Sequence, residues 1–146
     1  MIHIFILCYN ESVLLPHTIS HYRTNFPNCV ITILDNYSTD NSIEIALSLD
    51  CKYIKWKSPT LNGIDDVSYK TLKNNCWKNI EKGWIIMCDM DEWLCITEQE
   101  LVNEEKNNVS IIRVKGLNMM GESNNIKLTD INLQNITKYV DAPNQN

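Results

Sequence analysis

The sequence predicts an α/β fold in which a mostly parallel sheet is covered by helices on both faces. Two observations carry this expectation. Apolar strands alternate with helical segments along most of the chain, and polar turns follow three of the strands. Such alternation is typical of parallel sheets, whose strands are buried on both faces. We therefore expect a three-layer sandwich formed by a single domain over residues 1–146.

Four strands are expected to form the sheet. Each is an apolar or alternating run bounded by a polar turn. They cover Ile2–Cys8, Cys29–Leu34, Lys52–Trp56 and Trp84–Cys88. A fifth strand is expected at Val109–Val114. We expect the first four to be parallel, so that their carboxyl ends meet at one edge, where ligands bind in sheets of this kind.

Four helices are expected between or after these strands. Capping residues or helical periodicity mark each of them, and a Thr-Glu-Gln-Glu capping box at 97–100 opens the last. The first three cover Val13–Tyr22, Ser42–Ser48 and Asp65–Asn79. The signal fades after Gly116, and the Asn-rich end at 141–146 is expected to be unstructured.

Composition and charge exclude several classes of protein. Apolar residues make up 44% of the chain and charged residues 21%, which is typical of a globular domain. The net charge of −5 and the pI of about 5.1 argue against nucleic-acid binding, since such proteins normally carry a basic face. The apolar runs are far shorter than the ~20 residues of a membrane-spanning helix, so no membrane span is expected.

Six cysteines are spread along the chain without any Cys-x-x-Cys pair. Most lie in apolar runs, so we expect buried thiols in a reducing compartment rather than disulfides or zinc. Four glycosylation sequons support this, because a glycan on either of the two that fall in the polar turns would block a ligand there. A cytoplasmic location is therefore expected. The abundance of Ile and Asn suggests AT-rich coding DNA, as in some parasites and large DNA viruses.

The sharpest chemical signal is Asp89-Met90-Asp91 at the end of the fourth strand. Two carboxylates ~4 Å apart repel each other appreciably at an intermediate dielectric, and a divalent cation relieves that repulsion. Ligation by oxygen alone suits Mg²⁺ or Mn²⁺ rather than zinc. A solvated acidic turn explains the motif taken alone, but its place at a strand end favours a metal.

A second polar turn, Asp-Asn-Tyr-Ser-Thr-Asp at 35–40, follows the second strand. Its later residues are explained by a turn and a helix cap. A cap does not require Asp35, whose carboxylate could accept hydrogen bonds from a base N–H or ribose hydroxyls. His17 and His21 have the i, i+4 spacing of a helical metal pair, but no third ligand is evident, so we expect an ordinary outer face.

Taken in order, these turns resemble those of the nucleotide-sugar glycosyltransferases of family 2, which have the GT-A (Rossmann-like) fold. The resemblance covers about residues 2–95 and rests on Cys-Tyr-Asn-Glu at 8–11, Asp-Asn-Tyr-Ser-Thr-Asp-Asn-Ser at 35–42 and Asp-Met-Asp-Glu at 89–92. The Asp-Met-Asp-Glu-Trp form is closest to the branch whose signature resembles DxDEF. The resemblance implies binding of a UDP-sugar donor with Mn²⁺ or Mg²⁺.

The resemblance also implies a role for individual residues. Tyr9 and Glu11 would flank the uridine. The uracil would be bound by Asp35 or by Asn36, which stands where the family more often has a second Asp. Asp89 would contact the ribose or the sugar. The implied nucleotide-sugar-binding set is Tyr9, Glu11, Asp35, Asn36, Lys73, Asn74, Asp89, Met90 and Asp91, with Asp91 and Asp89 as the metal ligands.

The part after the Asp-x-Asp motif is shorter than in the family. The resemblance implies a nucleotide-sugar-binding half at 1–95 and a partial acceptor half at 96–146, with a truncated or disordered C-terminal end. A glycosyltransferase needs a base to deprotonate the acceptor hydroxyl. Glu122, beside Gly121, is the candidate for that base.

Three functions stay open from the sequence. The first is an inverting, metal-dependent glycosyltransferase that acts on an unknown saccharide or protein acceptor. The second is a nucleotide-sugar-binding domain of the same fold with little or no transfer. The third is an Asp-dependent phosphatase or phosphotransferase, although that chemistry usually places its Asp-x-Asp on the first strand. The chain has no P-loop and no GxGxxG, which excludes the NTPase and dinucleotide-oxidoreductase interpretations.

Overall fold

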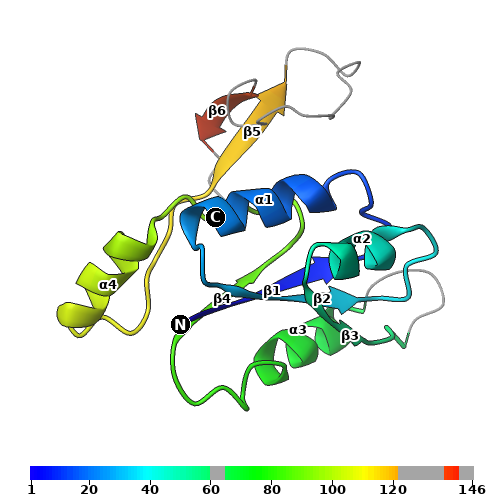
Figure 1. Ribbon diagram of the computed structural model, residues 1–146, viewed down its shortest axis with the longest axis horizontal. Helices are drawn as coiled ribbons and strands as arrows, with labels where there is room; N and C mark the ends of the chain where they lie inside the picture. The colour runs from blue at the N-terminus through cyan, green and yellow to red at the C-terminus, as the bar shows by residue number, and fades with distance from the viewer. Residues whose placement is uncertain (60–64, 122–136, 142–146) are drawn as a thin grey trace. The chain divides into compact units, whose positions relative to one another are not determined.

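The computed structural model describes residues 1–59, 65–121 and 137–141, and divides the chain into two units at Thr97. In the described part of the first unit, four strands form one sheet (Figure 1). They are β1 (Ile2–Cys8), β2 (Val30–Asp35), β3 (Lys52–Lys55) and β4 (Trp84–Cys88), in the order β3-β2-β1-β4. Every neighbouring pair is parallel, which confirms the predicted α/β class.

The register of these strands aligns their carboxyl ends. Cys8, the last residue of β1, pairs with Asp35, the last residue of β2. On the other side of β1, Ile6 pairs with Cys88, the last residue of β4. The turns that follow β1, β2 and β4 therefore leave the sheet at the same edge, as the sequence predicts.

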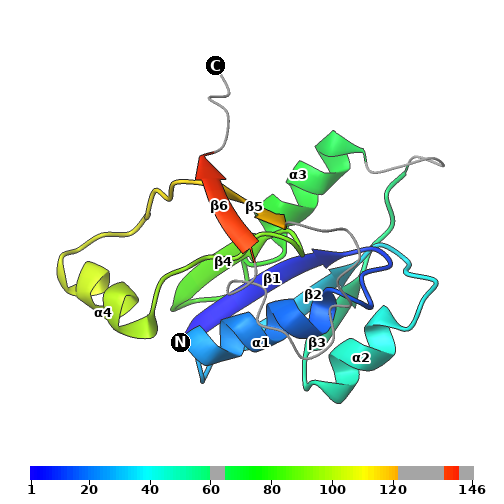
Figure 2. The ribbon, with the colours of Figure 1, turned by 90° about the horizontal axis from the view of Figure 1, so that it is seen from above.

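Helices cover both faces of this sheet (Figures 1 and 2). α1 (Leu15–Asn25) and α2 (Ser42–Ser48) lie on one face, and α3 (Asp66–Asn75) lies on the other. α1 begins two residues later than predicted and accommodates Pro16 in its first turn, where proline costs no hydrogen bond. Within the described residues, no helix is long and apolar enough to cross a membrane.

The core of the first unit lies on both faces of β1. Every residue of this strand except His3 is buried, which explains its continuous apolar sequence. Phe5 and Leu7 pack with Leu34 against the face that α3 covers. Because side chains alternate along a strand, Ile4 and the residues at every second position from it point to the opposite face, towards α1 and α2.

The second unit contains α4 (Glu98–Lys106) and an antiparallel pair formed by β5 (Leu117–Gly121) and β6 (Thr137–Asp141). The strand expected at Val109–Val114 is wrong, since residues 109–116 form no strand and β5 begins at Leu117. The apolar residues that predicted it are not buried, and Ile111 is 82% exposed. A strand pattern requires a sheet to bury it, and this segment has none.

Gly83, just before β4, provides a test of this fold. Its φ is 121°, and a Cβ at this position would collide with the carbonyl of Met1, which accepts the Trp84 N–H at 3.1 Å. We expect Gly83→Ala to lower the free energy of unfolding by about 1–3 kcal/mol in urea titrations, the range for a strained backbone position. Gly116→Ala is the control, because nothing lies within 4 Å of a Cβ there. Equal stability of the two variants would contradict the prediction.

Candidate functional site

A pocket of about 340 Å³ opens where the turns at the carboxyl edge of the sheet meet. Six of the nine residues predicted to bind a nucleotide sugar contribute to its wall. The full lining consists of Leu7, Cys8, Tyr9, Glu11, Leu14, Asn36, Trp56, Tyr69, Asp89, Met90 and Asp91. The wall combines three carboxylates with aromatic rings and one amide, so it can offer both charged and apolar surface to a ligand.

The turn after β1 is joined to the turn after β2 through Asn10. Asn10 has a φ of 58°, a left-handed conformation that Asn adopts more readily than most residues. Its Oδ1 accepts the N–H of Thr39 at 2.7 Å and that of Asp40 at 3.3 Å. Its own N–H donates to Ser38 Oγ at 3.0 Å. The two turns therefore hold each other in place at the mouth of the sheet.

Asp40 adds a second set of links between these turns. Its carboxylate accepts the Ser12 N–H at 3.1 Å and both the N–H and the hydroxyl of Ser42, at 3.0 and 2.6 Å. The Ser42 hydroxyl in turn accepts the Glu11 N–H at 2.8 Å. Burial opposes ionisation of Asp40, but the hydrogen bonds from Ser42 and Ser12 outweigh it and lower its pKa to about 2.

Asp35 and Asn36, either of which was predicted to bind the uracil, occupy different places. Asp35 is only 1% exposed, and its Oδ1 accepts the Ser38 N–H at 2.9 Å inside the turn. It does not line the pocket, whereas Asn36 does. Asn36 Oδ1 accepts the Ser58 N–H at 3.2 Å, so its NH₂ group is left to donate to another partner.

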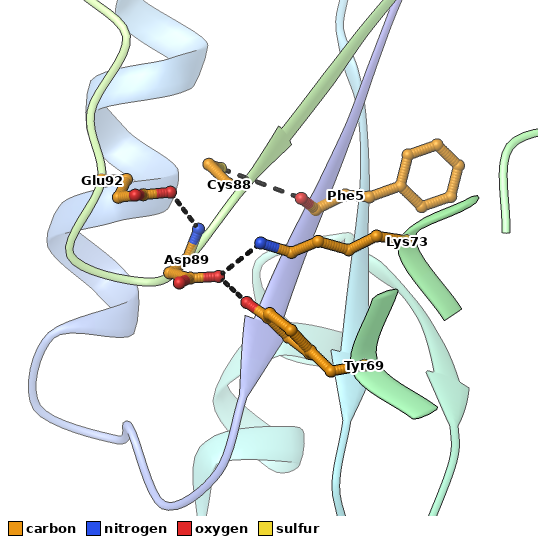
Figure 3. A network of polar contacts seen from close by, with 6 residues as sticks. All are labelled: Phe5, Tyr69, Lys73, Cys88, Asp89 and Glu92. Carbon is orange, nitrogen blue, oxygen red and sulfur yellow. Dashed lines mark hydrogen bonds and ion pairs between the residues drawn. The ribbon is translucent and has the colours of Figure 1, made fainter. Parts of the chain in front are cut away.

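Asp89 is held by residues of α3 and by its own turn (Figure 3). Its Oδ1 accepts hydrogen bonds from the Tyr69 hydroxyl and from Lys73 Nζ, the latter at 3.1 Å. Lys73 Nζ also lies 4.3 Å from the centre of the Tyr69 ring. The Asp89 N–H donates to Glu92 Oε2 at 3.0 Å. Burial raises the pKa of the Tyr69 phenol and the bond to Asp89 raises it further, so the hydroxyl stays protonated and donates.

Asp91 and Glu11 are the carboxylates of the wall that form no ion pair within the described residues. The Asp91 side chain is exposed, and within the described residues no hydrogen bond or ion pair engages its carboxylate. Burial raises the pKa of Glu11, and the charges of Asp91 and Asp40 raise it further. No group of three or more His, Cys, Asp or Glu side chains that could hold a metal occurs in the described part. A cation here would therefore need oxygen atoms of a ligand beside these carboxylates.

Other predicted residues lie away from the pocket or outside the described residues. Asn74 is exposed on α3 and does not line the pocket. Glu122, the candidate base, lies outside the described residues. His21, considered for a metal pair, instead stacks on Trp93 with ring centroids 4.9 Å apart. His21 and Trp93 therefore pack against each other within the first unit.

Trp56 and Tyr69 line the pocket but were not predicted to do so. Trp56 follows β3 and packs on the Phe5 and Leu7 core, and its indole N–H is buried without a hydrogen-bond partner in the described part. Tyr69 reaches the pocket from α3. The signal for Trp56 was present, because it follows a strand at the ligand edge. Nothing in the sequence indicates which face of α3 carries Tyr69 to Asp89.

The pH dependence of stability tests the role of Asp40. Its folded-state pKa lies below the unfolded value near 3.9, so its contribution is present above about pH 4 and is lost as pH falls towards 2. We expect Asp40→Asn to lower the free energy of unfolding by about 1 kcal/mol at pH 7, after allowing for solvent screening. The difference from wild type should shrink when urea unfolding is measured at pH 2.5.

Glu44→Gln on the exposed side of α2 serves as the control for this comparison. It removes one carboxylate from the same region without touching the turn links. A deficit for Asp40→Asn that is unchanged between pH 7 and pH 2.5 would contradict the role given to the Asp40 carboxylate.

Comparison with known proteins places the fold. No protein-family model matches the chain, and no curated protein matches it either. Among solved structures, Staphylococcus aureus TarS matches with a TM-score of 0.51 and 11% identity over 82% of this chain and 21% of TarS. At 11% identity this match shows the fold alone, so the chain has an α/β fold like that of TarS.

Two further structures are similar to the chain with TM-scores below 0.5. TarS 1–349 in complex with UDP-GlcNAc matches with a TM-score of 0.46 and 12% identity, over 72% of this chain and 30% of that one. The mannosyltransferase PcManGT from Pyrobaculum calidifontis, in complex with GDP-Man and Mn²⁺, matches with a TM-score of 0.47 and 15% identity, over 78% and 33%. The chain thus spans a third or less of the length of each of these structures, and what it shares with TarS is the fold.

Proposed function

We propose that the chain binds a UDP-sugar in this pocket and acts as a metal-dependent, inverting glycosyltransferase of family 2. The observation that carries the proposal is the pocket itself, which joins Asp89 and Asp91 of one turn to Glu11 and Asn36 of two others. Ligands of doubly wound α/β folds bind at this edge of the sheet. The acceptor is an unidentified saccharide or protein, and Glu122 is the proposed base.

The aromatic and amide part of the wall suits a nucleobase. Tyr9 and Trp56 offer faces on which a base can stack, and such stacking contributes about 1–3 kcal/mol per base. The NH₂ group of Asn36 is a hydrogen-bond donor. Uracil carries two carbonyl acceptors, so it matches a donor of this kind. Asp35 supports the base from inside the turn, through the position it gives to Ser38.

The acidic part of the wall suits a cation and a diphosphate. Lys73 already pairs with Asp89, which leaves Asp91 and Glu11 as the carboxylates that lack a cation partner in the described pocket. Asp91 would therefore be the principal metal ligand, and Asp89 would contribute its other oxygen or bind a hydroxyl of the ribose or sugar. When bound, Mn²⁺ or Mg²⁺ would neutralise negative charge on the diphosphate leaving group.

The contacts of Asp89 argue against a phosphatase. That reaction requires Asp89 as a nucleophile, but Lys73 and Tyr69 both donate to its Oδ1. Both donors bind lone pairs of Oδ1, which reduces the reactivity of this oxygen towards phosphorus. A nucleotide-sugar-binding domain without transfer uses the same pocket, and transfer assays with the bound donor distinguish the two.

The cysteines support a cytoplasmic location for the protein. All six lie in the described residues, and three of them, Cys8, Cys51 and Cys88, are buried. Burial raises the pKa of Cys8, Cys51 and Cys88, which keeps these thiols protonated and unreactive. Buried, unreactive thiols are expected in a reducing compartment.

Metal dependence tests the proposal. We expect Mn²⁺ to strengthen UDP binding in calorimetry by about tenfold or more relative to EDTA, because it offsets the charges of the diphosphate and the pocket. Asp91→Ala should remove this enhancement without lowering the melting temperature. Asp66→Ala, which removes an exposed carboxylate from α3, is the matched control. UDP binding that is equal in Mn²⁺ and EDTA would overturn the metal assignment.

Trp56 tests where the base lies. Trp56→Leu removes the aromatic face on which the base would stack, so UDP affinity should fall about fivefold or more, as expected for the loss of about 1 kcal/mol or more of stacking. Trp84→Leu is the control, because Trp84 begins β4 and does not line the pocket. Binding of ribose 5-phosphate, which lacks the base, should not change in Trp56→Leu. An equal loss for both ligands would place the base elsewhere.

A further inference from the structure

Side chains of helix α1 form hydrogen bonds to the backbone of the Asp-x-Asp segment. Thr18 is fully buried, and its hydroxyl donates to the Met90 carbonyl at 2.7 Å. The same hydroxyl accepts the indole N–H of Trp93 at 3.0 Å. This one hydroxyl therefore both donates to and accepts from the segment at 90–94, which is more than 70 residues away in the chain. The Leu14 carbonyl, at 3.4 Å, is a more distant acceptor for the same proton within the helix.

Tyr22 repeats the arrangement one helical turn later. It is fully buried, and its hydroxyl donates to the Glu92 carbonyl at 2.9 Å. It also accepts the Leu94 N–H at 3.2 Å. Burial raises the pKa of the Tyr22 phenol, so its hydroxyl keeps the proton that it donates.

His21 completes the grip on the same helix face. Its Nε2 lies 3.0 Å from the Leu94 carbonyl, which can only accept, so Nε2 carries the proton. Its ring stacks on that of Trp93. We call Thr18, His21 and Tyr22 the clamp, since they share one face of α1 at i, i+3 and i+4.

The clamp fixes both neighbours of Asp91 and leaves Asp91 itself open. The carbonyls of Met90 and Glu92 are each bound by a clamp hydroxyl, whereas Asp91 is exposed and lines the pocket. The same helix is tied to the other acidic turn, because the Leu15 N–H donates to the Glu11 carbonyl at 2.9 Å. One rigid helix thus sets the distance between Glu11 and Asp91, although their charges repel.

We propose that Thr18 and Tyr22 are positioning residues that hold Asp91 in place for a divalent cation and the diphosphate it neutralises. The proposal rests on the proposed function. Holding two like charges together costs free energy in the absence of a cation, and buried hydrogen bonds to backbone carbonyls offset that cost. Without the clamp, the turn relaxes away from Glu11 and the cation loses a preformed site. Binding of the nucleoside part does not depend on it.

The experiment compares four substitutions on α1 by calorimetry with UDP, in Mn²⁺ and in EDTA. Thr18→Val keeps the shape and removes both hydrogen bonds, whereas Thr18→Ser keeps the hydroxyl. Thr24→Val is the matched control, because the Thr24 hydroxyl is exposed and bonds only to Ser20 within the helix. Tyr22→Phe is the second test of the clamp, and melting curves establish that each variant folds.

We expect Thr18→Val and Tyr22→Phe to reduce the Mn²⁺ enhancement of UDP affinity by about tenfold, with affinity in EDTA within about twofold of wild type. Thr18→Ser and Thr24→Val should keep the full enhancement. In an Asp91→Ala background, Thr18→Val should have no further effect, since both substitutions act through the same carboxylate. A purely structural role would instead weaken binding in EDTA and add to the effect of Asp91→Ala.

The outcomes separate this proposal from the proposed function. Wild type that responds to Mn²⁺, together with a Thr18→Val variant that responds equally, overturns the clamp alone. Additive effects of Thr18→Val and Asp91→Ala overturn it as well. Wild-type UDP binding that ignores Mn²⁺ overturns the proposed function and the clamp role with it. Hydrogen exchange that is faster at 90–94 but unchanged at 33–36 in Thr18→Val supports the clamp independently of any ligand.

Discussion

The parallel register of β1 with its two neighbours is the constraint on which the rest of the site depends. Because Cys8 pairs with Asp35 and Ile6 pairs with Cys88, three turns leave the sheet together at one edge. A slip by one residue would turn every side chain of β1 to the opposite face, where it would no longer fit the side chains packed there. The hydrophobic core therefore enforces the geometry of the polar pocket.

The carboxylates at this edge of the sheet differ in their partners. Asp40 accepts hydrogen bonds from backbone and hydroxyl donors of the two joined turns, and Asp89 accepts them from Lys73 and Tyr69. Nearby donors therefore stabilise the negative charge of both. Asp91 has no such partner in the described residues, and its neighbour Glu11 feels that charge. The pocket consequently holds two carboxylates that no cation of the described residues neutralises, and this negative charge is the physical basis of the function we propose.

The rigidity of the site comes from connections between segments far apart in sequence. Asn10 joins the first turn to the second, and α1 joins the first turn to the Asp-x-Asp backbone. The free-energy cost of removing such buried polar groups from water is offset only if each of them forms hydrogen bonds. The clamp hydroxyls of Thr18 and Tyr22 meet this condition, because each both donates and accepts. The buried N–H of Trp56 departs from the pattern, and it does so in the wall of the pocket.

The sequence by itself determined the elements of the first unit, their parallel order and the turns that bear the chemistry, because burial periodicity and capping are local properties of the chain. It was wrong about the strand at 109–114, where an apolar pattern met no sheet to bury it. Only the tertiary structure decided that Asn36 rather than Asp35 lines the pocket, that Lys73 and Tyr69 reach Asp89, and that α1 carries the Asp-x-Asp turn. These relations depend on how helices rotate and pack on the sheet, and that rotation is set by the fit of many side chains at once rather than by any local pattern.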